Sequence, residues 1–87
     1  MPDLGAPSSY LMLEPGVPVW SSDEQQVGTV AQVLSAPEED IFDGIVVATD
    51  DGPRYIEGAD VREIYERGVE LAVRAVVVSV SPRGPRR

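Results

Sequence analysis

IFDGIVVATDDGPRYIE, residues 41–57, is the stretch that decides the fold of this 87-residue chain. Its first nine residues are rich in β-branched side chains, which pack well on a pleated sheet. The Asp51-Gly52 pair that follows is the strongest short-range signal for a hairpin turn, and residues 54–57 then return as a second strand. The centre of the chain is therefore predicted to be a β-hairpin.

Two further strand patterns precede this hairpin. Residues 17–21 and 27–34 read as strands separated by a polar turn. Pro18 restricts the first of them to a sheet edge or to the strand's first residues, because proline donates no backbone hydrogen bond. Gly28 indicates a bend or bulge of the kind that curls a sheet.

Two more strand patterns follow the hairpin. Residues 61–66 and 69–74 read as strands joined by a tight connection that ends in Gly68. We expect Gly68 to occupy the left-handed backbone region, in which glycine has no steric penalty. Residues 61–73 also fit a single amphipathic helix, but the central glycine and the β-branched content favour the hairpin.

Six short strands separated by turn signals predict an all-β fold. Closure into a small barrel removes the edges that a flat sheet would expose. We therefore expect one small, closed or partly open antiparallel barrel of about six strands over residues 10–80. Residues 1–9 are rich in proline, glycine and serine, and residues 81–87 combine arginine, proline and glycine, so both ends are expected to be disordered.

The order and spacing of these segments resemble the PRC-barrel family. The resemblance spans residues 11–74 and is that of a stand-alone, soluble member. It implies a small β-barrel that serves as a docking module, with no catalytic residues to transfer. The matching runs are GVPVWSSD at 16–23, VGTV at 27–30, DIFDGIVV at 40–47, RYI at 54–56, Val61, and IYERGV at 64–69.

Residue composition excludes several kinds of chemistry. The chain has no cysteine, so disulfides and thiolate nucleophiles are excluded. It has no histidine, which removes the usual general base and the commonest metal ligand. All seven basic residues are arginines, so lysine Schiff bases are impossible. We therefore expect a protein without enzymatic activity, catalytic residues or a cofactor.

Charge is distributed unevenly along the chain. Residues 1–53 carry ten carboxylates and no basic residue, and residues 54–87 carry seven arginines and five carboxylates, so −10 and +2 sum to −8. An acidic surface repels phosphate backbones, so we expect no nucleic-acid partner. The alternative function, a ribosome-assembly or RNA-processing factor, would need a basic face beyond Arg83, Arg86 and Arg87.

The hydropathy of the chain predicts no membrane-spanning segment. No apolar run approaches the ~20 residues that span a bilayer. The first residues lack the basic and apolar regions of a signal peptide. We therefore expect no membrane insertion and a cytoplasmic location.

The carboxylates leave a weak cation-binding function open as a second alternative. Hard cations such as Ca²⁺ take about six to eight oxygen ligands. The spacing of the acids does not match an EF-hand loop, so we favour solvated loop residues. The residues concerned are Glu38, Glu39, Asp40, Asp43, Asp50 and Asp51.

One feature points to a protein–protein interaction surface. Residues 41–49, read as a strand, are mainly apolar on both faces, whereas a strand of an isolated barrel alternates between apolar and polar. Residues 75–80 (AVVVSV) are uncharged and β-prone, and suit pairing along a sheet edge. This tail, a second copy of the chain or an unknown protein partner could cover the outer face, and we favour a twofold homodimer. The candidate interaction residues are Ile41, Phe42, Ile45, Val47, Val76, Val78 and Val80.

Overall fold

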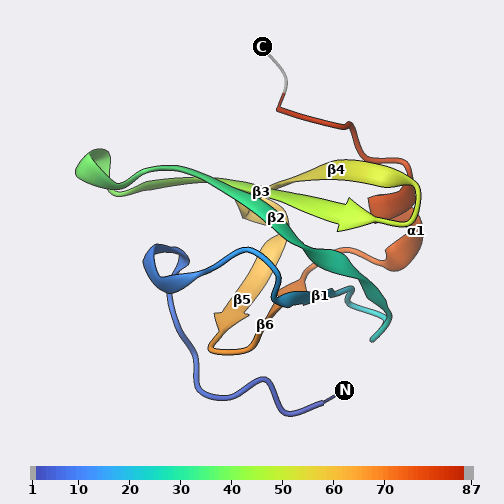
Figure 1. The fold of residues 1–87 in the computed structure, drawn as a ribbon, viewed down its shortest axis with the longest axis horizontal. Coiled ribbons are helices and arrows are strands. Elements are labelled where there is room, and N and C mark those ends of the chain that lie inside the picture. The colour runs from blue at the N-terminus through green and yellow to red at the C-terminus, as the bar shows by residue number, and fades with distance from the viewer. Residues whose placement is uncertain (1, 86–87) are drawn as a thin grey trace.

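The computed structural model of the protein describes residues 2–85 and contains one six-stranded sheet (Figure 1). The strands lie in the order β4-β3-β2-β1-β6-β5, so β4 and β5 form two free edges and the sheet does not close. The all-β prediction is confirmed, in its partly open form. The strands are β1 (Pro18–Trp20), β2 (Gln26–Ala36), β3 (Ile41–Thr49), β4 (Gly52–Glu57), β5 (Val61–Tyr65) and β6 (Gly68–Leu71).

The central hairpin forms as the sequence predicts. β3 pairs antiparallel with β4, and the pair Thr49–Gly52 closes the turn at Asp50 and Asp51. Gly52 has a φ of +101°, a backbone conformation that residues with a side chain rarely adopt. The Thr49 hydroxyl donates a hydrogen bond to the Gly52 carbonyl oxygen at 2.7 Å. Backbone freedom at position 52 and this short bond together define the turn.

β2 is long and curled, and its curl creates the core. Its pairing with β3 shifts register between Val30 and Gln32 and again between Leu34 and Ser35, and such bulges increase the local twist. Gly28 lies where β2 approaches β3 most closely, since a Cβ there would collide with the carbonyl oxygen of Ala48. The curled sheet encloses a core of Val19, Val30, Ile45, Val47, Ile56, Val69, Leu71 and Val78.

One strand pair departs from the expected antiparallel barrel. β1 and β6 lie parallel, with Val19 opposite Val69 and Trp20 opposite Glu70. Most of the chain separates these two strands, which gives the long crossover that parallel pairing requires. The β5–β6 hairpin is thereby attached beside β1 and runs across the strands of the central hairpin (Figure 1).

Residues 61–71 form the β5–β6 hairpin, so the prediction of two strands is confirmed and the alternative of a single helix is wrong. The prediction that Gly68 occupies the left-handed backbone region is also wrong. Tyr65 pairs with Gly68, so the loop consists of Glu66 and Arg67, and Gly68 begins β6. Gly68 is not among the described glycines with positive φ. Packing requires glycine at position 68 instead, because a Cβ there would lie 2.8 Å from Cδ2 of Leu4.

The N-terminal segment runs along the free edge of β5, in contrast to the disorder that its composition predicts. The backbone N–H of Ser8 donates to the Ile64 carbonyl oxygen at 2.7 Å. At the other end of the segment, the backbone N–H of Arg67 donates to the Leu4 carbonyl oxygen at 2.9 Å. Paired backbone groups at this edge are not available to a neighbouring strand.

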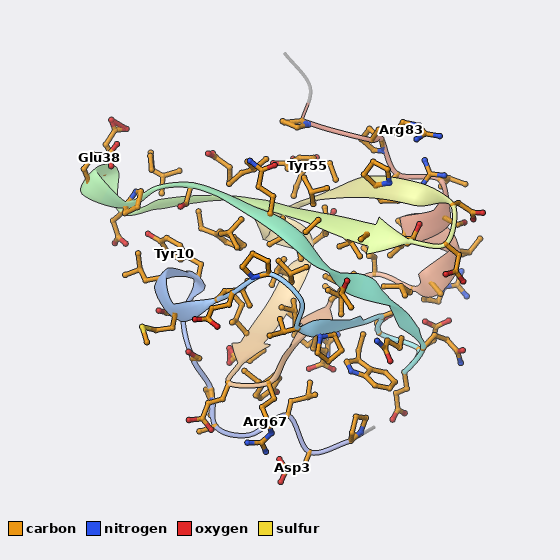
Figure 2. All side chains as sticks on the ribbon, in the orientation of Figure 1. Asp3, Tyr10, Glu38, Tyr55, Arg67 and Arg83 are labelled. Carbon is orange, nitrogen blue, oxygen red and sulfur yellow. The ribbon has the colours of Figure 1, made fainter. Side chains whose placement is uncertain are left out.

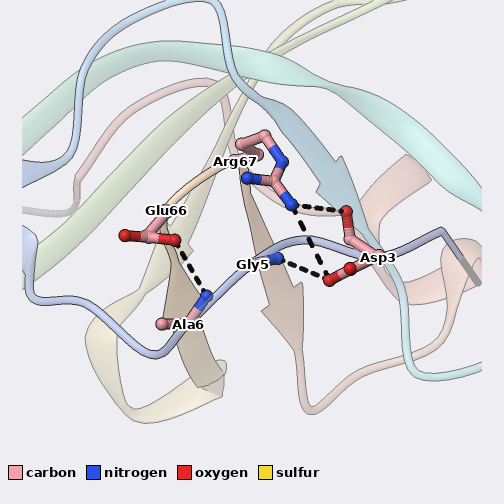
Figure 3. Close-up of polar contacts among 5 residues, drawn as sticks. All are labelled: Asp3, Gly5, Ala6, Glu66 and Arg67. Atoms are coloured by element: carbon pink, nitrogen blue, oxygen red, sulfur yellow. Dashed lines mark hydrogen bonds and ion pairs between the residues drawn. The ribbon is translucent and has the colours of Figure 1, made fainter.

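Side chains reinforce this contact (Figure 3). A carboxylate oxygen of Glu66 accepts a hydrogen bond from the Ala6 N–H at 3.0 Å. The Arg67 guanidinium lies 3.8 Å from the Asp3 carboxylate. Leu4 is buried against the sheet, and this burial is what the proline- and serine-rich composition could not indicate.

The other free edge, β4, is covered by the C-terminal segment. The Tyr55 N–H donates to the Pro82 carbonyl oxygen at 2.6 Å, and Pro53 offers no N–H at all. The expected disorder of residues 81–87 therefore does not describe residues 81–85, which lie beside β4. Arg86 and Arg87 lie outside the described residues.

The tail at residues 75–80 differs most from its prediction, because Ala75–Ser79 forms the short helix α1 and not a strand. Valine is a weak helix former, so tertiary contacts decide this conformation. Val78 enters the core, and the N–H of Val77 donates to the Arg74 carbonyl oxygen at 3.0 Å. Three 3₁₀ turns complete the structure, η1 (Tyr10–Met12), η2 (Pro37–Glu39) and η3 (Gly58–Asp60).

Candidate docking surfaces

The structure divides the predicted interaction residues between core and surface. Ile45 and Val47 are fully buried and Val78 is nearly so, so these three belong to the core and not to an interface. Phe42 is half-buried, with its ring stacked on that of Tyr10. The remaining three residues are exposed, namely Ile41, Val76 and Val80.

Helix α1 presents an apolar surface. A strand would place Val76, Val78 and Val80 on one face, but a helix of about 3.6 residues per turn groups Val76 and Val80 with Val77. These three side chains, the α1 patch, are 59%, 40% and 77% exposed respectively. Val77 was not predicted as an interaction residue, because strand alternation turns it away from the other two. Helical periodicity is the signal that would have included it.

A polar cluster holds the start of α1 against the β1–β2 turn. The carboxylate of Asp23 accepts a hydrogen bond from the Ala75 N–H at 3.0 Å and another from the hydroxyl of the buried Ser21. These two donors, with the hydroxyl acting most strongly, hold the pKa of Asp23 below its ordinary value. The helix is therefore attached by its backbone at one end and by Val78 in its middle.

Charges of both signs lie near helix α1. Asp50 and Asp51 line a hollow of about 150 Å³ beside the helix. Arg83 lies over the same turn, since a Cβ on Gly52 would come within 3.0 Å of its guanidinium. Arg74 precedes the helix and attracts the Asp23 carboxylate. This mixture differs from the uniformly acidic first half of the chain.

A second exposed surface lies where η1 approaches the tip of the β2–β3 hairpin. Figure 2 shows Tyr10 and Glu38 at this end of the molecule. The Tyr10 ring stacks on Phe42 with centroids 5.1 Å apart, and its hydroxyl donates to the Asp40 carboxylate at 3.2 Å. Loss of contact with water and then the bond to Asp40 raise the pKa of Tyr10 above its ordinary value. η1 is thus attached to the hairpin tip.

The side chains around this contact are apolar on η1 and acidic on the hairpin tip. Leu11 and Met12 are 62% and 73% exposed. In the sequence these residues belong to a short apolar run at positions 10–13, close to Ser9 and Pro15, and nothing in that pattern indicates exposure. The arm patch is defined as Leu11, Met12, Glu38, Glu39 and Asp40, all of them exposed.

A hollow of about 570 Å³ lies on the outer side of the central strands. The Tyr55 hydroxyl, within it, donates to the backbone carbonyl oxygen of Asp43 at 3.0 Å. Burial raises the pKa of Tyr55, and the carboxylates of Asp43 and Glu57 raise it further, so the phenol is neutral at neutral pH. Tyr55 acts there as a structural donor. The hollow is lined by Gln32, Val33, Leu34, Ser35, Asp43, Tyr55 and Pro85.

The acidic residues considered for cation binding do not converge. Glu38, Glu39 and Asp40 precede β3, whereas Asp50 and Asp51 follow its opposite end. Across residues 2–85, no group of three or more acidic side chains is placed so that it could hold a metal ion. Three of the carboxylates lie in the arm patch, Asp50 and Asp51 lie near α1, and Asp43 lines the hollow beside Tyr55.

No family model and no curated protein matches the sequence. The resemblance to PRC-barrel domains therefore stays a prediction. In the described part of the chain, none of the helices has the length and apolar character needed to cross a membrane.

Proposed function

We propose that this protein is a non-enzymatic docking module that associates with a second copy of itself through the α1 patch. The observation that carries this proposal is the exposure of Val76 and Val77 on α1, and of Val80 directly after it, while Val78 anchors the helix in the core. Contiguous exposed apolar surface on a small domain is typical of a protein–protein contact. A twofold axis would let two copies bury the same patch against each other.

Because the backbone groups at the sheet edges are already paired, two copies would associate through side chains and not through edge strands. Residues 4–8 pair with β5, and the Pro82 carbonyl pairs with Tyr55 on β4, so the main edge hydrogen bonds are made within the chain. Joining two copies by adding one strand to another would require displacing these segments. Helix α1, in contrast, is exposed without any rearrangement.

Electrostatics favour α1 over other surfaces for self-association. Two copies of a chain with net charge −8 repel one another in general. Near α1 the carboxylates of Asp50 and Asp51 are accompanied by Arg74 and Arg83, which reduces the repulsion between two copies there. The lack of histidine, cysteine and lysine and the resemblance to PRC-barrel domains, which implies docking, support the non-enzymatic part of the proposal.

The expected affinity is low. Each partly exposed valine contributes about 1.5 kcal/mol when it is removed from water, which is the lower end of the range for this side chain, so the six valines of two copies contribute about 9 kcal/mol. Association costs at least ~4 kcal/mol in lost translational and rotational freedom. We therefore expect a dimer that dissociates in the range of about 0.1–1 mM.

Sedimentation equilibrium tests the proposal. The wild-type mass should rise from 9.4 kDa toward twice that value as the concentration approaches ~1 mM. Val80→Asp should hold the mass at 9.4 kDa, because an unpaired charge would be buried in the contact. Ala31→Asp adds the same charge at an exposed position on β2 and should leave the dimer intact. A wild-type mass that stays at 9.4 kDa throughout would refute self-association.

A further inference from the structure

We infer that the arm patch binds a segment of another protein that carries arginine or lysine beside large apolar side chains. This inference rests on the proposed docking function but uses a different surface from the α1 patch. Its two halves, the apolar turn η1 and the acidic tip of the β2–β3 hairpin, are joined by the Tyr10–Asp40 hydrogen bond of 3.2 Å.

The apolar half of the arm patch consists of the exposed side chains of η1. The Tyr10 ring is used in the stack on Phe42, at an interplanar angle of 14°. The next two side chains of the turn, Leu11 and Met12, then point away from this anchor and are mostly exposed. The unbranched, polarizable methionine side chain adapts to apolar groups of different shapes, which suits a docking surface.

The acidic half selects the charge of the partner. Glu38, Glu39 and Asp40 follow one another and are all exposed. No arginine or lysine occurs in residues 1–53, so neither η1 nor the β2–β3 hairpin tip carries a basic residue. Arg62 of β5 lines a hollow beside Tyr10 together with Glu63, so the three carboxylates of the tip still outnumber the basic side chains nearby. Complementary potentials across an interface favour encounter and suppress partners of the same sign. A basic segment meets this condition, and an acidic one is repelled.

The same charge argument excludes a second copy as the preferred occupant. Two arm patches brought together would place three carboxylates of one copy against three of the other. The patch therefore differs from α1, where charges of both signs lie nearby. We accordingly assign self-association to α1 and a partner of opposite charge to the arm patch.

The hairpin tip is also held in one shape. Pro37 begins the 3₁₀ turn η2, where its fixed φ suits the turn. Asp40 ends it in the left-handed region, with a φ of 55° and its N–H bonded to the Pro37 carbonyl oxygen at 3.0 Å. Because the acidic side chains stand on a fixed backbone, less conformational entropy is lost when they bind a partner.

Fluorescence anisotropy with a short synthetic peptide of arginine and leucine, added to the full chain, tests the inference. We expect the peptide to bind at ~20 mM salt and to weaken strongly by ~500 mM, where charges are screened. A second peptide with glutamate in place of arginine should not bind. Glu38→Lys combined with Glu39→Lys should weaken binding about tenfold, and Leu11→Ser combined with Met12→Ser should weaken it by a similar factor because apolar contact is lost.

The matched control carries the same charge change at the opposite end of β3. Measured at ~0.1 M salt, Asp50→Lys combined with Asp51→Lys should change the affinity by less than about twofold. The nine residues of β3 hold the two sites about 30 Å apart, which is well beyond the Debye length of ~10 Å at that salt concentration. An equal loss in this control would mean that net charge alone attracts the peptide, which overturns the inference. So would a failure of the peptide to bind at low salt.

Two measurements separate this inference from the α1 proposal. If Leu11→Ser with Met12→Ser lowers the mass of the dimer in sedimentation, the arm patch holds a second copy and the inference is overturned. If the peptide binds as expected while the wild type stays at 9.4 kDa, the arm patch stands and self-association through α1 fails.

Discussion

Replacing Gly68 with alanine tests how the β5–β6 hairpin receives the N-terminal segment. The new Cβ would lie 2.8 Å from Cδ2 and 3.2 Å from Cδ1 of Leu4, and 3.2 Å from the carbonyl oxygen of Pro18. Since Gly68 does not have a positive φ, the backbone itself accepts alanine. The cost therefore arises from displacing the buried Leu4 side chain.

The expected loss of stability in Gly68→Ala follows from the exposure of the Leu4 side chain to water. Moving a buried leucine side chain into water costs about 1.5–3 kcal/mol, which sets the expected loss for Gly68→Ala. In a domain of this size, a loss of 1 kcal/mol lowers the melting midpoint by about 4–8 °C. Leu4→Ala alone should cost at least ~2 kcal/mol, because it removes buried methyl groups.

The decisive measurement is a double-mutant cycle by urea denaturation. Leu4→Ala removes the two Leu4 atoms that the new methyl group would meet and leaves only the Pro18 carbonyl oxygen, so Gly68→Ala should add little in that background. The coupling free energy between the two sites should then be about 1.5–3 kcal/mol. Gly16→Ala is the control, since Gly16 has a φ of +97° and a Cβ there would meet nothing within 4 Å.

The control should cost about 1 kcal/mol through backbone strain and should not couple to Leu4. If the effects of Gly68→Ala and Leu4→Ala are additive, the contact between Leu4 and Gly68 does not exist in solution. A Gly68→Ala variant as stable as the wild type would refute the packing argument directly.

Three further predictions concern the core, the Asp23 cluster and the buried tyrosine. Val78→Ala should lower the free energy of unfolding by about 2 kcal/mol, whereas Val80→Ala should change it by less than ~0.5 kcal/mol; equal effects in urea denaturation would contradict the burial of Val78. The pKa of Asp23 is lower in the folded than in the unfolded state, so its stabilisation is present above the unfolded value and is lost as pH falls through the folded one. The difference in urea midpoint between wild type and Asp23→Asn should therefore shrink from pH ~7 to pH ~3, and a constant difference would argue against a charge effect. Tyr55→Phe should cost about 1 kcal/mol by removing the hydrogen bond to Asp43. The pKa of Tyr55 is raised by folding, so the wild type should lose this advantage as pH rises above ~10, and an advantage that persists at pH ~11 would count against it.

Local sequence signals were sufficient to predict that these segments form strands. Residues 41–49 became β3 with the same limits, and the Asp51-Gly52 pair became a turn in which Gly52 has a positive φ. Both results depend on interactions between near neighbours in the chain, namely strand propensity and turn conformation. The same holds for the central glycine and the β-branched content that favoured the β5–β6 hairpin over a helix.

The candidate docking surfaces could be predicted only in part. The apolar character of the tail was visible in the sequence, and Val76 and Val80 are exposed. Their grouping with Val77, and the burial of Val78, depend on a helix that valine does not favour by itself. The arm patch was missed because it forms from two segments that meet through the Tyr10–Phe42 stack.

Sequence alone determined the composition-based exclusions, the limits of β3 and the uneven charge, because each of these depends on residue identity or on adjacent residues. Tertiary structure decided the parallel β1–β6 pair, the packing role of Gly68 and the attachment of both chain ends to sheet edges. Each of these depends on residues far apart in the chain, such as Leu4 over Gly68 and Pro82 beside Tyr55. Local propensity contains no information about such partners, because the contact free energy appears only when the whole sheet has curled around its core.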